Sequence, residues 1–187
     1  MFKVIKTFLS ITALLGFFAQ VNASDLFVIQ SDTALKSKNG KIAKLFIGVP
    51  VQIIKNDTKS VEVSVQGYKF DDLNVYSTKG KELLIATLDE GFEVIKKEGN
   101  QVELLGSVSK DLLSNDIEGI WEEQQEFYYD MCSVCHAAPQ IPHHTMMEWE
   151  ALFTPMVGFA KLEKEEAAEL LRFIKSISKN GLVKAEH

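Results

Sequence analysis

Cys132-Ser133-Val134-Cys135-His136 is the stretch that decides how the second half of the chain is interpreted. Two cysteines three positions apart, followed at once by a histidine, are typical of the attachment site of a c-type haem. One helical turn brings both sulfurs to the two vinyl positions at the porphyrin edge, where each forms a thioether. The imidazole of His136 can then ligate the iron. The motif therefore predicts one covalently bound haem c, held by Cys132 and Cys135, with His136 as the proximal ligand.

Two other interpretations of the motif fit less well. A redox dithiol of the thioredoxin type does not need a histidine at the next position, and the surrounding residues do not resemble a strand that leads into a helix. A zinc site would need two more ligands, which His143 and His144 could supply. The adjacency of these two histidines and the preceding Pro142 fit poorly with two ligands on one helical face.

Residues 1–23 have the pattern of a secretory signal peptide. Lys3 and Lys6 form the positive segment, residues 7–19 are apolar, and cleavage is predicted after Ala23, which leaves Ser24 first. An uncleaved anchor fits less well because the apolar run is shorter than the ~20 residues that span a bilayer. We therefore expect a periplasmic protein with no membrane span after cleavage, in the compartment where haem is attached covalently.

The net charge of the chain limits the classes of molecule that it is expected to bind. Residues 117–187 contain 12 Asp and Glu but only 6 Lys and Arg, and the whole chain has a net charge of −6. No part of the chain is basic enough to predict binding to nucleic acid. The acidic balance instead favours a protein partner with a basic docking face.

Residues 25–116 have the pattern of short β-strands separated by glycines and Asn/Asp turns. The stretch also looks duplicated, because Val51-Gln52-Ile53-Ile54-Lys55 and Phe92-Glu93-Val94-Ile95-Lys96 align at an offset of 41 residues. Each unit resembles a bacterial SH3-like repeat, at about residues 30–70 and 71–113. The alternative is a single small β-barrel or sandwich. A module of this kind implies docking to a partner or to a cell-envelope polymer.

The sequence period changes near Ile117, and three helices are expected beyond it. The first covers residues 118–131, the second begins after Thr145 and bends or ends near Thr154 because Pro155 follows, and the third covers residues 164–178. The predicted fold class is therefore an α+β multidomain chain. Its expected parts are the signal peptide at 1–23, a small all-β SH3-like domain at 24–116, and an all-α class I cytochrome c domain at 117–187.

The sixth iron ligand is left open between several residues. A ligand on the distal side must reach over the ring from the far side, and Met156, 20 residues after His136, meets that requirement best. His144 and His143 are the alternatives, and an iron with no sixth protein ligand is the third. The choice affects function, because methionine raises the potential, a second imidazole lowers it, and an open site permits gas binding or peroxidase chemistry.

The stretch from the haem motif to Ser178 resembles the C-terminal monohaem domain of the cytochromes that serve periplasmic trimethylamine N-oxide and dimethyl sulfoxide reductases. The resemblance is carried by the motif, Thr145, Trp149, Met156 seven residues after that tryptophan, and a leucine-rich closing helix. It implies the downstream half of a pathway, electron transfer to a molybdopterin-dependent oxidoreductase. The upstream donor expected for such a carrier is a quinol dehydrogenase or another cytochrome, and the resemblance does not imply direct oxidation of quinol by this chain. The full family members also carry a membrane-bound tetrahaem module, which this chain replaces with its β-rich part.

We therefore expect a one-electron carrier of anaerobic respiration, not an enzyme. Two other functions stay open. One is a haem enzyme or gas sensor with an open sixth site, and the other is an envelope-binding module with an accessory haem.

Overall fold

The computed structural model describes residues 26–183, so the predicted signal peptide lies outside the described residues. The β-rich part contains ten strands: β1 (Leu26–Val28), β2 (Thr33–Lys36), β3 (Ile42–Leu45), β4 (Pro50–Asn56), β5 (Ser60–Lys69), β6 (Asn74–Tyr76), β7 (Leu84–Leu88), β8 (Val94–Lys96), β9 (Gln101–Ser109) and β10 (Leu113–Ser114). The helical part follows with α1 (Ile117–Cys132), the short 3-10 helix η2 (Ile141–His143), α2 (Met146–Ala160) and α3 (Lys164–Ile177). Another short 3-10 helix, η1 (Lys110–Leu112), precedes β10.

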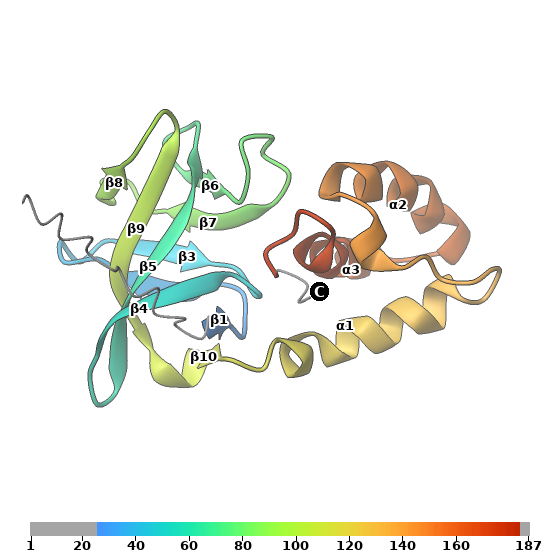
Figure 1. Ribbon diagram of the computed structural model, residues 1–187, viewed down its shortest axis with the longest axis horizontal. Coiled ribbons are helices and arrows are strands. Elements are labelled where there is room, and N and C mark those ends of the chain that lie inside the picture. Colours follow the sequence, from blue (N-terminus) through green and yellow to red (C-terminus); the bar gives the residue numbers. More distant parts are fainter. Residues whose placement is uncertain (1–25, 184–187) are drawn as a thin grey trace, which may run out of the picture.

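Six of the strands close into a barrel (Figure 1). In the order β5-β6-β7-β3-β2-β9 each strand pairs with the next, and β9 then pairs with β5 to complete the ring. The closing pair is long and antiparallel, running from Ser60 opposite Ser109 to Tyr68 opposite Gln101. The strands β4, β1 and β10 continue the sheet from β5, and β8 adds to β9.

The barrel core follows from the alternation of apolar residues in the two longest strands. Val61, Val63 and Val65 of β5 are buried, as are Leu104 and Val108 of β9. Successive side chains of a strand point to opposite faces, so these residues line the inner face of the sheet. Two of them, Val61 and Val108, lie directly opposite each other in the β5–β9 pair.

Local signals in the sequence explain where the helices begin. The carboxylate of Asp116 accepts a hydrogen bond from the amide of Gly119 (2.9 Å) and caps α1. A capping box formed by Thr145 and Glu148 starts α2. Pro155 does not end α2, which continues to Ala160. The prediction that the helix ends near Thr154 is therefore wrong, and the reason is local: Pro155 is exposed, so water can satisfy the carbonyl that it leaves without a partner.

The helix α3 lies between the barrel and the other two helices (Figure 1). It contacts both α1 and α2. On its barrel side, the Arg172 guanidinium donates to the carbonyls of Ile47 (3.0 Å) and Leu84 (2.8 Å). Lys175 donates to the carbonyl of Glu82 (2.9 Å). The helical and β-rich parts are thus joined by partly buried hydrogen bonds.

Trp121 of α1 makes a second contact with the barrel side. It packs against Gly48, whose φ of +79° lies in the left-handed region, and a Cβ at this position would collide with the indole. Glycine is therefore required at position 48 both by the turn and by the close approach of the helix.

The predicted fold class is wrong. The described residues are mostly β, with ten strands and three α-helices, and the helices do not form an all-α class I cytochrome c domain. The physical reason is that Arg172 and Lys175 of α3 donate hydrogen bonds to carbonyls of the β-rich part, so the helices pack on the barrel and do not form a separate domain. The two stretches expected as SH3-like repeats also share one barrel, because β3 pairs with β7 and β5 pairs with β9. Within residues 26–183, no helix is both long enough and apolar enough to cross a membrane.

Candidate functional site

The cysteine motif lies where α1 ends. Cys132 is the last residue of the helix, and the amide of Ser133 donates to the carbonyl of Tyr129 (3.1 Å), which closes the final turn. Both cysteines are free thiols; Cys132 is half-buried, and Cys135 is exposed. Burial raises the pKa of the Cys132 thiol above its ordinary value. The site therefore presents two thiols one helical turn apart, as thioether attachment requires.

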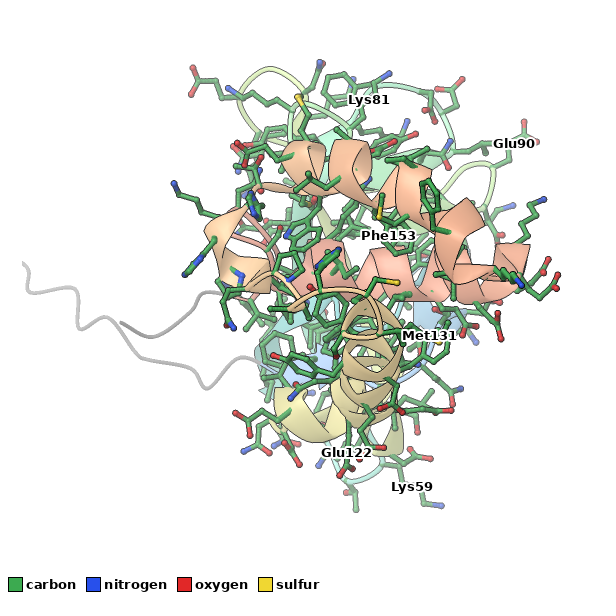
Figure 2. All side chains as sticks on the ribbon, turned by 90° about the vertical axis from the view of Figure 1, so that its right-hand side faces the viewer. Lys59, Lys81, Glu90, Glu122, Met131 and Phe153 are labelled. Atoms are coloured by element: carbon green, nitrogen blue, oxygen red, sulfur yellow. The ribbon has the colours of Figure 1, made fainter. Side chains whose placement is uncertain are left out.

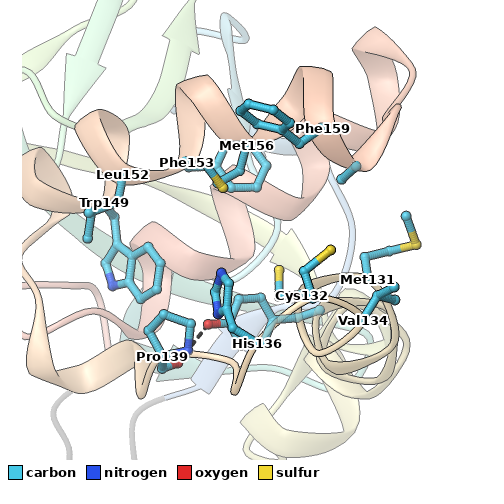
Figure 3. Close-up of a pocket in the computed structure, with 13 residues that line it drawn as sticks. Met131, Cys132, Val134, His136, Pro139, Trp149, Leu152, Phe153, Met156 and Phe159 are labelled. Carbon is cyan, nitrogen blue, oxygen red and sulfur yellow. Dashed lines mark hydrogen bonds between the residues drawn. The ribbon is translucent and has the colours of Figure 1, made fainter.

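A cavity of about 420 Å³ opens beside the motif. This volume is in the range of small-molecule and cofactor pockets. One wall comes from the end of α1 and the loop after it, and the other comes from α2 (Figure 3). The lining is almost entirely apolar apart from the motif: Tyr128, Met131, Cys132, Val134, Cys135, His136, Pro139, Trp149, Leu152, Phe153, Met156, Phe159 and Ala160. Viewed from the helical end of the molecule, Phe153 of α2 lies above Met131 of α1 (Figure 2).

Two buried aromatic side chains fix the loop that follows the motif. The hydroxyl of Tyr128 donates to the carbonyl of Pro139 (2.6 Å), and the indole of Trp149 donates to the carbonyl of Ile141 (2.8 Å). The pKa of Tyr128 lies well above its ordinary value of 10. The largest cause is the desolvation of the buried phenol, and the neighbouring Cys132 and Tyr129 raise the pKa further. The loop that carries His136 is therefore bound from both α1 and α2.

The hydrogen bond of His136 identifies which ring nitrogen is free. Its Nδ1 lies 2.9 Å from the carbonyl oxygen of Ala137. A carbonyl can only accept, so Nδ1 must carry the proton, and Nε2 keeps its lone pair. This arrangement is the one that prepares a histidine to bind a metal, because the hydrogen bond fixes the tautomer.

The α2 wall leaves large apolar side chains open to solvent. Phe159 is 80% exposed, Leu152 is 44% exposed and Met156 is 41% exposed. Large apolar side chains that are exposed together on one face of a helix mark a place where another molecule binds. A flat apolar macrocycle with a metal centre fits this wall and the thiol and imidazole donors opposite it, so the residues present fit haem c.

The structure separates the candidates for the sixth ligand. Met156 lines the cavity from α2, across it from His136 (Figure 3). Neither His143 nor His144 is among the lining residues. His143 is exposed in η2, and the ring of His144 packs edge-on against Trp149 at 5.3 Å between centroids. The alternative of a zinc site gains no support, since residues 26–183 bring together no group of three or more His, Cys, Asp or Glu that could hold a metal ion.

The sequence analysis missed several residues of the site. It placed Tyr128 and Trp149 on helices but did not identify them as the donors that hold the loop. It also missed Phe159, which lies one helical turn after Met156. That signal was present, because a helix that continues past Pro155 puts positions 152, 156 and 159 on one face.

The chain is distantly similar to curated cytochromes. It is 23% identical over 139 residues to the cytochrome c-type protein TorC of Escherichia coli K12, covering 66% of this chain and 36% of that protein. It is 22% identical over 118 residues to the cytochrome c-type protein TorY of Haemophilus influenzae, and this match covers 57% of this chain and 32% of that protein. The chain thus spans about a third of the length of the curated relatives it matches.

No protein-family model matches the chain, and no solved structure matches it either. The resemblance to SH3-like repeats is therefore not confirmed. What the comparisons confirm is the coarser prediction, a similarity to cytochrome c-type proteins.

Proposed function

We propose that the chain is a periplasmic monohaem c-type cytochrome that transfers single electrons. The observation that carries the proposal is the position of Cys132, Cys135 and His136 on one side of an apolar cavity, with Met156 on the other. In this proposal the two thiols form thioethers, and Nε2 of His136 and the sulfur of Met156 bind the iron. Once bound, haem c supplies a one-electron redox centre whose potential depends on axial ligands and burial.

The apolar lining has a definite part in this function. Trp149 and Phe153 are buried and close the inner end of the cavity, while Phe159 and Val134 lie at its exposed side. The buried end would keep water from the iron, and the exposed side would leave one edge of the ring accessible to a partner. A carrier needs this asymmetry, because an electron must enter and leave without any substrate reaching the iron.

The partner follows from the resemblance and from the similarity to TorC and TorY. We propose that the electron passes to a periplasmic molybdopterin oxidoreductase that reduces trimethylamine N-oxide or dimethyl sulfoxide. A quinol dehydrogenase or another cytochrome would supply it. Stopped-flow mixing of the reduced protein with such a reductase at low salt would show haem oxidation that depends on reductase concentration. No oxidation by any such reductase would reject the partner and leave the carrier function standing.

Haem attachment is tested by mass spectrometry of protein exported from a host that matures c-type cytochromes. We expect a chain that begins at Ser24 and carries one covalently bound haem. Cys135→Ser should leave a single thioether and shift the α band of the reduced spectrum, because one vinyl group stays conjugated with the ring. Ser133→Ala, between the cysteines but outside the cavity lining, is the matched control and should attach haem normally. An unmodified wild-type chain with a Cys132–Cys135 disulfide would refute the proposal.

A further inference from the structure

Arg172 is a half-buried cation whose hydrogen-bond partners are neutral. Its guanidinium donates to two barrel carbonyls, those of Ile47 and Leu84, and lies over the ring of Phe46 at 4.7 Å from the centroid. Among the described residues it takes part in no ion pair. Burial lowers its pKa to about 10. Partial desolvation of a charge that has no opposite charge beside it is unfavourable, and here the two carbonyls and the ring of Phe46 offset that cost at a defined position on the barrel.

Arg172 is connected to the cavity through its neighbour on α3. Phe173 is fully buried, and its ring packs against Trp121 (5.6 Å between centroids) and Tyr128 (6.5 Å). Tyr128 in turn donates to the carbonyl of Pro139, three residues after His136. The path from the barrel carbonyls to the loop that carries the histidine thus runs through Arg172, the rigid backbone of α3, the packed rings of Phe173 and Tyr128, and the Tyr128 hydrogen bond.

We propose that Arg172 is a positioning residue, which fixes α3 on the barrel so that Phe173 and Tyr128 hold the His136 loop in place. The planar guanidinium suits this purpose, because it can donate to both carbonyls at once from a fixed direction. A lysine at the same position can point at only one of them at a time. The inference rests on the proposed function in one respect, namely that His136 binds the haem iron.

The test compares reduction potentials of full-length holoprotein variants at a temperature where all of them are folded. Residues that orient a metal ligand tune the metal centre, and loss of a direct outer-shell partner typically costs about tenfold or more in metal affinity or activity, which sets the scale for this more remote residue. We expect Arg172→Gln to change the ratio of oxidised to reduced haem at a fixed potential by about tenfold, which is about 59 mV for one electron. Arg172→Lys should give an intermediate shift. Leu104→Ala, in the barrel core and away from α3, is the control that lowers the unfolding temperature without moving the potential.

Several outcomes would overturn the inference. A shift in Arg172→Gln no larger than that in Leu104→Ala would show a purely structural contact. If Arg172→Lys had the reduction potential of the wild type, only the positive charge at position 172 would matter, and the planar shape of the guanidinium would not. If Arg172→Gln does not fold, Phe173→Leu carries the test, because it keeps both carbonyl bonds and removes the ring that touches Tyr128; an unchanged potential would refute the inference.

A double-mutant cycle adds an independent measurement. If Arg172 acts through Tyr128, the shift of the double variant Arg172→Gln, Tyr128→Phe should be smaller than the sum of the two single shifts. Additive shifts would contradict a shared path. A wild-type chain without covalent haem would overturn both this inference and the proposed function, whereas haem attachment with an unmoved potential would overturn the inference alone.

Discussion

Met156 is the single side chain on which the redox properties should depend most. Replacing it with Ala removes the only thioether of α2 that lines the cavity within the described residues. We expect the ferric protein to lose its sulfur-to-iron band at the red end of the spectrum and the potential to fall, because methionine stabilises ferrous iron. Met147→Ala, at a methionine that is 66% exposed and outside the lining, is the control and should change neither. If the parent lacks the band and His144→Ala changes the spin state, the distal ligand is a histidine.

Tyr128 should make stability fall in alkaline solution. Its pKa is raised in the folded protein, so the folded state keeps the phenolic proton where the unfolded state, with a pKa of about 10, releases it. The contribution is complete below about pH 10 and is lost as the pH rises toward the folded pKa. Urea unfolding between pH 8 and pH 11 should show this decline, and Tyr128→Phe should flatten it. Tyr129→Phe removes only the last of the three causes of the raised pKa, so most of the decline should remain in that variant.

At the scale of elements, the start of α2 depends on one capping box. Thr145→Ala removes the hydroxyl that accepts from the amide of Glu148 (3.3 Å) and should lower the free energy of unfolding by about 1 kcal/mol. Thr154→Ala is the matched control, because that hydroxyl bonds only to the Glu150 carbonyl within the same helix (2.6 Å). Thermal unfolding of both variants would compare them directly. Equal destabilisation would mean that the cap does not determine where α2 begins.

The sequence was a good guide to the three helices and to the extent of α1 and α3, and a poor one to the end of α2 and to how the helices assemble. The apolar spacing of α3 and the caps of α1 and α2 are local signals, and the structure has helices where they predict them. Pro155 was misleading because the rule against proline in a helix weakens where the freed carbonyl meets solvent. The motif residues and Met156 are predicted from their order along the chain, whereas the hydrogen bonds of Tyr128 and Trp149 depend on partners across a loop.

At the scale of the whole molecule, the interface of helices and barrel could not be predicted. The bonds of Arg172 join positions 125 and 88 residues apart. In the sequence Arg172 looks like an ordinary charged residue on an amphipathic helix, and nothing nearby shows that its partners are carbonyls. The assumption of a self-contained all-α domain followed from that omission, as did the wrong fold class.

Alanine variants of Gly48 and Gly40 allow the energy of the close contact between Gly48 and Trp121 to be measured. Both have a φ near +80°, at +79° and +81°, but a Cβ at Gly48 meets Trp121 whereas a Cβ at Gly40 meets nothing within 4 Å. Each alanine variant should therefore show the backbone strain of about 1–2 kcal/mol. Gly48→Ala should lose a further 1–3 kcal/mol, roughly, from overpacking against the indole. Chemical unfolding gives both values, and equal losses would mean that Trp121 moves aside without cost.

The hydrogen bonds of Arg172 also bear on how the contact between barrel and helices responds to acidic pH. The carbonyls of Ile47 and Leu84 are not ionisable, so the hydrogen bonds that Arg172 donates to them do not depend on a charged partner, unlike the pair of Lys175 with Glu150 at 2.6 Å. A protein exported to the periplasm, as proposed here, experiences the acidity of its surroundings with little buffering from the cell. The contact between barrel and helices would therefore survive a drop in pH that neutralises the acidic surface, and the cavity would keep its shape while the molecule changes its charge.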